Sequence, residues 1–119
     1  MCFHARPKST AALRANRQRI TGYKLVNRNR TSLHYSGSGL VFTKGRTVAA
    51  RTDAARFVTC NKRAVYVRAG IYLYNSLRKA RAERITGEMA IRVSFSPKDV
   101  LGVSADGTLI CVRRVRVDS

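Results

Sequence analysis

The clearest pattern of apolar and polar positions lies in residues 89–96, where apolar residues alternate with small or polar ones and one arginine. Because successive side chains of a β-strand point to opposite faces, this alternation predicts a strand with one buried face. The apolar side of this strand consists of Met89, Ile91, Val93 and Phe95. Residues 96–99 follow with Pro97 at a position that a helix tolerates, so we expect a turn or one helical turn there.

The end of the chain predicts a hairpin. In its second strand the apolar residues switch from even-numbered to odd-numbered positions. A short apolar run at 100–103 and the pair Asp106-Gly107 indicate the first strand and its turn. The apolar residues of the second strand, residues 109–117, can all point to the same face only if the strand contains one extra residue. We therefore predict a β-bulge near Arg113 and Arg114. The apolar positions of its two halves are Ile110 and Val112, then Val115 and Val117.

Shorter runs of β-branched and aromatic residues occupy the region before residue 75 and are separated by Asn, Gly, Ser and Lys. Runs of this length and composition are typical of short strands joined by turns. The strands predicted in this region are 20–26, 32–35, 40–43, 47–50, 57–60, 64–67 and 71–74.

One segment, residues 77–85, has the pattern of a helix. Asn75 or Ser76 can cap its start, and Gly87 ends it. Its narrow apolar side consists of Leu77, Ala80, Ala82 and Ile85. We therefore predict an α+β fold: a small, mostly antiparallel β-sheet domain with one main helix (about 76–85) and a basic N-terminal arm.

Residues 1–19 form a polar segment without acidic residues, in front of a single α+β domain over 20–119. Two forms of this basic arm are open. It can be a short helix over 9–17 capped by Ser9 or Thr10, or a flexible segment that becomes ordered on a polyanion. We prefer the flexible segment.

The charge of the chain is strongly positive and unevenly distributed. Of 119 residues, 24 are Lys or Arg and 6 are Asp or Glu, which gives a formal net charge of +18. The first acidic residue is Asp53, and eleven cations precede it. Self-repulsion at this density favours a polyanion as partner, and arginine suits phosphate better than lysine does. The alternative is a solvated basic surface that only keeps the protein soluble.

The densest basic cluster on a predicted strand is formed by Arg113, Arg114 and Arg116. Arg114 and Arg116 share a face, and Arg92 on the neighbouring pattern can align with them. Such a ridge suits phosphates spaced along a nucleic acid, which it would position without recognising bases. The candidate nucleic-acid-binding residues are Arg14, Arg17, Arg19, Arg28, Arg30, Arg63, Arg68, Arg92, Arg113, Arg114 and Arg116.

Two tyrosines are candidates for base stacking. Tyr72 and Tyr74 share one face of the 71–74 strand, with Arg63 and Arg68 close in sequence. Such a platform can stack unpaired bases while arginine contacts phosphate. The alternative, which we favour, is that both are half-buried core residues whose hydroxyl groups reach water.

Little in the sequence supports catalysis or metal binding. The three cysteines, Cys2, Cys60 and Cys111, have no paired spacing, and two histidines and six acids offer few groups for a reaction. We expect no enzymatic activity, no metal and no cofactor, and inert thiols in a reducing, intracellular setting. No apolar run approaches the ~18–20 residues of a membrane helix, so we expect no membrane partner.

One set of segments bears on the origin of the chain. It comprises the run 66–74, Ala90-Ile91-Arg92-Val93, Pro97-Lys98-Asp99-Val100, Val103, Asp106-Gly107, the run 112–117, the opening Met1-Cys2-Phe3, and Gly22-Tyr23-Lys24. This set resembles a family of small uncharacterised tailed-phage proteins over about residues 20–117. In that family His often follows the Gly-Ile pair, whereas Tyr72 stands there in this chain. The resemblance implies a viral origin and an α+β fold, and it brings no catalytic residues.

These observations lead to one functional expectation and its alternatives. We expect a small, basic, non-enzymatic phage-type accessory protein that binds nucleic acid (DNA or RNA) or a host nucleoprotein complex in the host cytoplasm, as a counter-defence or host-takeover inhibitor. One alternative is a virion structural component whose basic arm contacts the packaged genome or neighbouring subunits. Another is an inhibitor that docks its cations on an acidic host protein.

Overall fold

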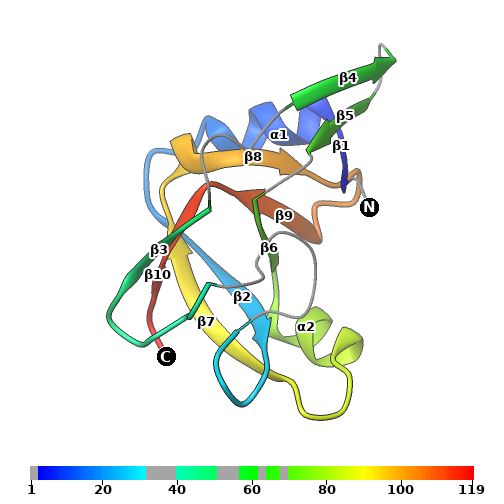
Figure 1. The fold of residues 1–119 in the computed structure, drawn as a ribbon. Helices are drawn as coiled ribbons and strands as arrows, with labels where there is room; N and C mark the ends of the chain where they lie inside the picture. The colour runs from blue at the N-terminus through cyan, green and yellow to red at the C-terminus, as the bar shows by residue number, and fades with distance from the viewer. Residues whose placement is uncertain (1–2, 32–39, 51–56, 62–63, 68–69) are drawn as a thin grey trace.

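The computed structural model describes residues 3–31, 40–50, 57–61, 64–67 and 70–119, and these form an α+β fold (Figure 1). The predicted fold class is confirmed. In chain order the elements are β1 (Phe3–Ala5), α1 (Pro7–Arg14), β2 (Ile20–Val26), β3 (Thr47–Ala49), β4 (Phe57–Asn61), β5 (Ala64–Val67), β6 (Ile71–Tyr74), α2 (Leu77–Glu83), β7 (Met89–Phe95), the 3₁₀ helix η2 (Pro97–Asp99), β8 (Val100–Val103), β9 (Leu109–Val112) and β10 (Arg114–Val117).

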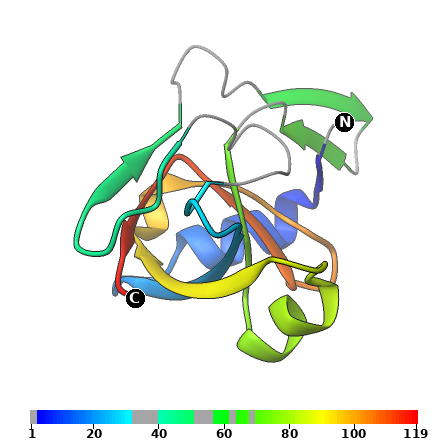
Figure 2. The same cartoon turned by 60° about the horizontal axis from the view of Figure 1, so that its bottom comes forward.

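The larger sheet has seven strands in the order β3-β10-β7-β2-β6-β9-β8, and all its pairings are antiparallel. β9 and β10 follow each other in the chain, yet β7, β2 and β6 lie between them in the sheet. The sheet must therefore curl until its two ends approach, and both views show the strands wrapping around a common interior (Figure 1, Figure 2).

In residues 109–117 the apolar positions switch from even to odd numbers, and the cause is not the predicted β-bulge. The segment is not one strand with a β-bulge: β9 ends at Val112, and β10 begins at Arg114 with new partners. Between them, the Arg113 amide donates to the Asp99 carbonyl oxygen at 2.7 Å, and the Arg113 carbonyl accepts from the Ala50 amide at 2.8 Å. This single residue lets both strands bury their apolar side chains in the same core.

The core lies inside the curl, and all seven strands of the larger sheet contribute side chains to it. Strand β7 supplies its predicted apolar residues Ile91, Val93 and Phe95, whereas Met89 at its start is 39% exposed. Such burial of large apolar side chains is the main stabilising contribution to a fold of this size. The largest fully buried side chains are Phe42, Phe95, Ile71, Leu73, Leu101, Val26, Val93, Val100, Val112, Val115 and Val117.

The N-terminal segment is helical, so the flexible form that we preferred is wrong. Helix α1 begins with Pro7 at its first turn, not at the predicted Ser9 cap. It runs along the free edge of β8: the Val103 amide donates to Thr10 Oγ1 at 3.0 Å, and Arg14 Nη1 donates to the Val100 carbonyl oxygen at 2.7 Å. These side chains hydrogen-bond to backbone groups at the edge of β8 that would otherwise need a neighbouring strand. The bonds anchor the N-terminal segment to the larger sheet.

The remaining shorter elements agree with the predictions to different degrees. Helix α2 has the predicted Ser76 cap, whose Oγ accepts from the Lys79 amide at 3.2 Å, but it ends at Glu83. The predicted strand 40–43 is only an isolated bridge between Val41 and Thr31, although Phe42 is buried in the core. The predicted strand 32–35 lies outside the described residues.

The smaller sheet has the order β1-β5-β4, with antiparallel pairings. The β4–β5 hairpin projects away from the curled sheet in both views (Figure 1, Figure 2). The predicted strands 57–60 and 64–67 are confirmed. Neither described helix is long and apolar enough to cross a membrane.

Candidate nucleic-acid interface

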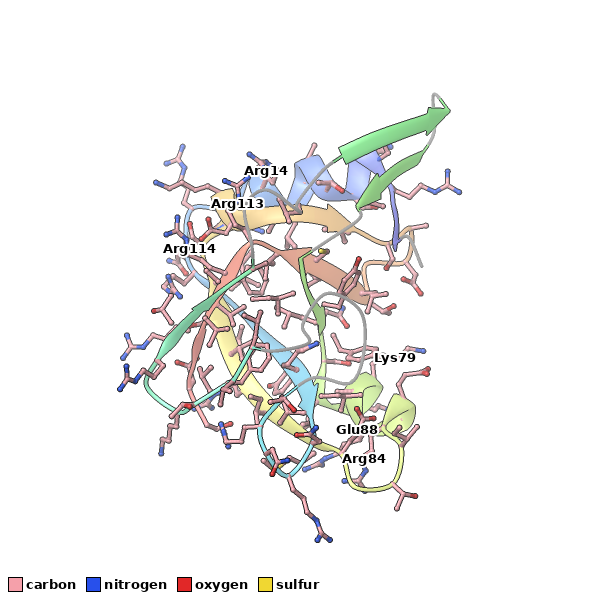
Figure 3. The ribbon with its side chains drawn as sticks, viewed as in Figure 1. Arg14, Lys79, Arg84, Glu88, Arg113 and Arg114 are labelled. Atoms are coloured by element: carbon pink, nitrogen blue, oxygen red, sulfur yellow. The ribbon has the colours of Figure 1, made fainter. Side chains whose placement is uncertain are left out.

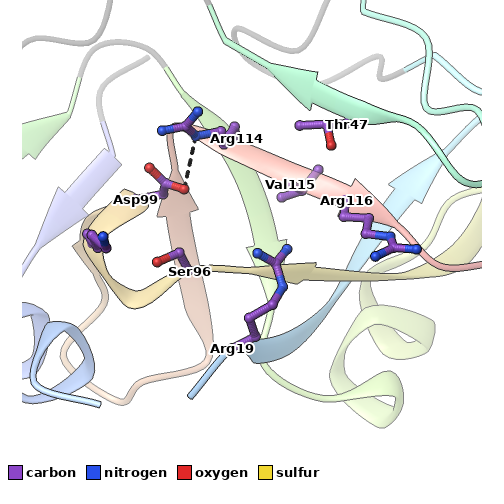
Figure 4. Close-up of a pocket in the computed structure, with 8 residues that line it drawn as sticks. Arg19, Thr47, Ser96, Asp99, Arg114, Val115 and Arg116 are labelled. Atoms are coloured by element: carbon purple, nitrogen blue, oxygen red, sulfur yellow. Dashed lines mark hydrogen bonds and ion pairs between the residues drawn. The ribbon is translucent and has the colours of Figure 1, made fainter. Parts of the chain in front are cut away.

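A cleft of about 490 Å³ opens on the outside of the curled sheet where β10 and β7 diverge. The two strands pair only through Arg116 with Ser94 and Val117 with Val93. Beyond this point the chain of β7 turns into η2, while β10 continues back to Arg114. The space between the separating strands is the cleft, and Figure 4 shows the residues around it.

Four cations from three parts of the chain line this cleft: Arg19, Lys98, and the β10 residues Arg114 and Arg116. Arg114 and Arg116 alternate in β10 and are both exposed, because the intervening Val115 is buried in the core. Arg19 lies just before β2, and its Nη2 donates to the Ser94 carbonyl oxygen at 3.1 Å and to Ser94 Oγ at 3.3 Å. Guanidinium groups stay charged at all ordinary pH values, so the arginines of the cleft keep their positive charge.

Two carboxylates accompany these cations. Asp99 Oδ2 accepts from Arg114 Nε at 3.1 Å, and the Asp99 side chain is only 13% exposed (Figure 4). Asp118 Oδ1 lies 4.0 Å from Arg116 Nε, a looser contact. The Arg114 guanidinium is therefore partly engaged within the protein, whereas that of Arg116 is more available.

Arg92 extends the positive charge along β7. Residues 92 and 94 point to the same side of this strand, and Ser94 is the cross-strand partner of Arg116. Arg92 is exposed and lies on the same outer face as Arg114 and Arg116, which is the alignment that the alternation predicts. Together we call these residues the cationic surface: Arg19, Arg92, Lys98, Arg114 and Arg116.

Arg14 and Arg113 border the cleft without lining it. The Arg14 guanidinium donates to the Val100 carbonyl, and the Arg113 amide donates to the Asp99 carbonyl, so both are fixed next to η2. In Figure 3 they appear at the same end of the molecule as Arg114, while Arg84 lies at the opposite end near α2. Both side chains are exposed and add to the positive potential at the rim.

The other predicted arginines lie elsewhere. Arg17 and Arg28 are exposed in connecting segments, before and after β2. Arg30 has a structural role: its Nε donates to the Phe42 carbonyl and its Nη2 to the Ser119 carbonyl, both at 2.6 Å, and its φ is +60°. Arg63 and Arg68 lie outside the described residues.

Tyr72 cannot stack on a base in this fold. Its side chain is 4% exposed and packs against Ala5, Leu101 and Cys111 on the outer side of β6 and β9. The stacking hypothesis for Tyr72 is therefore wrong, because the N-terminal segment covers this part of the sheet. Tyr74 lies two residues further along β6 and remains partly exposed.

Sequence patterns alone missed Lys98, Ser96 and Thr47, which line the cleft. The run 96–99 was predicted only as a turn, and nothing in its pattern indicates that it faces Arg19 and β10. The turn prediction itself is confirmed by η2. The hydroxyl groups of Ser96 and Thr47 add neutral hydrogen-bond donors, a combination with arginine that is common in contacts to phosphate oxygens.

The described residues contain no group of three or more His, Cys, Asp or Glu side chains that could hold a metal ion. Cys111 is a free, fully buried thiol, and burial raises its pKa to about 12. It is therefore not a reactive thiolate at neutral pH.

Comparisons with protein-family models, with curated proteins and with solved structures found no match to this chain.

Proposed function

We propose that this protein binds nucleic acid through the phosphate groups of its backbone, with the cationic surface as the contact region. The observation that carries the proposal is the cleft between β10 and β7, where Arg19, Lys98 and the β10 pair Arg114 and Arg116 come together from three segments. Charges that served only solubility would have no reason to converge on one hollow. The hydroxyl groups of the lining and the planar guanidinium groups suit phosphate oxygens.

The net charge of +18 strengthens this proposal. A protein that neutralises several phosphates releases bound counterions, and its affinity then falls steeply with salt. Contacts of this type position a backbone without selecting a sequence. We therefore infer a sequence-independent, salt-dependent interaction with DNA or RNA, and no enzymatic step.

In its biological setting, we propose a phage-type accessory protein that acts on nucleic acid or on a host nucleoprotein complex in the host cytoplasm. The resemblance over residues 20–117 supports this setting. The alternative of a virion component with an extended basic arm is less favoured, because α1 is bound along β8 through Thr10 and Arg14. Docking on an acidic host protein would use the same cations and is an outcome of the test below.

The double variant Arg114→Gln/Arg116→Gln tests the proposed function. We expect wild-type protein to bind a generic 20-nucleotide DNA or RNA with a Kd below about 1 μM at low salt, the range expected of contacts to several phosphates. Loss of two phosphate contacts should lower the slope of log K against log salt by about 1.5. Fluorescence anisotropy across a salt series measures both quantities.

The matched control is Arg81→Gln/Arg84→Gln, which removes the same charge from two exposed positions, one within α2 and one just after it. Figure 3 shows Arg84 at the opposite end of the molecule from Arg114. This control should keep nearly the full salt slope. Equal losses in both double variants would show that only net charge matters, and micromolar or weaker binding by the wild type at low salt would overturn the proposal. Nuclease-resistant capture of an acidic protein, with no binding to nucleic acid, would favour the docking alternative.

Asp99→Asn should strengthen binding to the same oligonucleotide by about fivefold. The carboxylate of Asp99 holds Arg114 Nε at 3.1 Å and competes with a phosphate for the same guanidinium. The amide removes this competition and preserves the shape of the side chain. A fivefold change corresponds to about 1 kcal/mol, the scale of one partly exposed ion pair. Anisotropy titrations at constant salt measure this change.

Glu83→Gln is the control for Asp99→Asn, because Glu83 also accepts from a cation at 3.1 Å, namely Lys79 of α2. It removes one negative charge from a distant ion pair. If both variants gained affinity equally, the effect of Asp99 would be that of net charge alone, and the competition within the cleft would be refuted.

A further inference from the structure

Two partly exposed tyrosines from different strands lie next to the cationic surface. Tyr23 of β2 is the cross-strand partner of Tyr74 of β6 on one side and of Arg92 of β7 on the other. Side chains of directly opposed residues point to the same face of a sheet. Tyr74, Tyr23 and Arg92 therefore form one row across three adjacent strands, on the outside of the curl.

The position of this row explains why its tyrosines keep an accessible surface. Leu25, two residues along β2 on the same face, is 4% exposed, whereas Thr21 in the other direction is exposed. Tyr23 lies between them, at the boundary between covered and open sheet. On β6 the same boundary runs between Tyr72, which is buried, and Tyr74, which is partly exposed.

Resting on the proposed function, we propose that the protein prefers single-stranded nucleic acid, whose bases stack on Tyr23 and Tyr74 while its phosphates bind the cationic surface. Aromatic side chains bind bases of any sequence because every base has a π-face. The bases of a duplex are stacked on each other and expose only their edges, so this row can contribute only to binding of unpaired nucleotides.

The dimensions of the sheet fit this arrangement. Neighbouring strands are about 4.8 Å apart, so Tyr74 and Arg92, with β2 between them, are separated by about 10 Å. Arg116 is a diagonal neighbour of Arg92 across the β7–β10 pair, at about 7–8 Å. A nucleotide whose phosphate binds an arginine can thus place its base on the adjacent tyrosine, and the next phosphate can reach the cleft.

The first experiment uses the wild-type protein and three ligands of equal length: a 20-nucleotide thymidine strand, the same backbone with abasic sites, and a duplex. We expect the base-bearing strand to bind about tenfold more tightly than the abasic strand at the same salt concentration, as stacking of one or two bases predicts. We also expect it to bind more tightly than the duplex. Equal affinities for base-bearing and abasic strands would overturn this inference and leave the binding of phosphates intact.

The second experiment changes the tyrosines. Tyr23→Leu and Tyr74→Leu should each weaken binding to the thymidine strand about fivefold and leave binding to the abasic strand unchanged. Tyr23→Phe and Tyr74→Phe keep the ring and should keep the affinity. Loss of affinity for both strands in the leucine variants, or in the phenylalanine variants as well, would contradict stacking. Failure of the wild type to bind any of the three ligands would instead refute the proposed function.

Discussion

Lys24→Met is expected to raise the free energy of unfolding by about 2 kcal/mol at pH 7. Lys24 is 3% exposed and lies within the curled sheet, where its Nζ donates to the Tyr72 carbonyl oxygen at 3.0 Å and sits 5.8 Å from the centre of the Phe42 ring. Burial lowers the pKa of Lys24 to about 8, although Cys111 and Glu88 act in the opposite direction. Methionine has a similar length and carries no charge that must leave water.

The same residue makes stability depend on pH. The unfolded chain holds this proton up to about its ordinary pKa of 10.5, whereas the folded protein releases it at about 8. Between these values the unfolded state binds more protons, so stability rises with pH. Wild-type stability should increase by about 1 kcal/mol from pH 7 to pH 9, and Lys24→Met should lack this increase.

Urea unfolding at pH 7, 8 and 9 measures both effects. The range ends at pH 9 because folding raises the pKa of Cys111 from 9.0 to about 12, so this thiol increasingly lowers stability as the pH rises through 9. Lys98→Met, at an exposed position of η2, is the control and should leave the pH profile unchanged. If Lys24→Met were less stable than the wild type, or kept the wild-type pH profile, the buried charge of Lys24 would not lower the free energy of unfolding.

Gly70→Ala is expected to lower the free energy of unfolding by about 3 kcal/mol, because it overpacks a closed part of the fold. A Cβ atom at this position would overlap Cys111 Sγ, and it would lie 3.1 Å from Leu101 Cδ1 and 3.2 Å from the Val112 carbonyl oxygen. Cys111 is fully buried, so its side chain has no free space to enter. Urea or thermal unfolding measures the loss.

The double variant Gly70→Ala/Cys111→Ala separates this contact from a general effect of the backbone. Removal of the sulfur should restore about 1 kcal/mol relative to the sum of the two single changes, since residues in contact are not additive. Strict additivity would indicate that Gly70 is required for another reason. Near-wild-type stability of Gly70→Ala would contradict the close approach of residue 70 to β9.

Local sequence was sufficient for most of the strands of the curled sheet. The alternation in β7 and the run that forms β2 depend on side chains only a few residues apart, and the structure has the predicted bounds of β2. The Ser76 cap of α2 and the turn at Asp106-Gly107 are equally local. These elements were predictable because a strand period, a cap or a turn is determined by neighbouring residues.

Other features depend on partners distant in the chain. Helix α1 was predicted as a flexible arm because its apolar content is low, and its anchors are polar bonds from Thr10 and Arg14 to β8, about ninety residues away. The buried Lys24 looks in sequence like an ordinary solvated cation of a strand. Its environment is set by Tyr72 and Phe42, which no local pattern connects to it.

The sequence by itself determined the excess of cations, the α+β character and the shared face of Arg114 and Arg116, because composition and the period of a strand are properties of the chain. Only the tertiary structure decided that Arg19 and Lys98 join them in one cleft, and that Tyr23 rather than Tyr72 lies beside Arg92. The physical reason is strand register: pairing between distant segments determines which side chains become neighbours, and it is fixed by burial of the whole core.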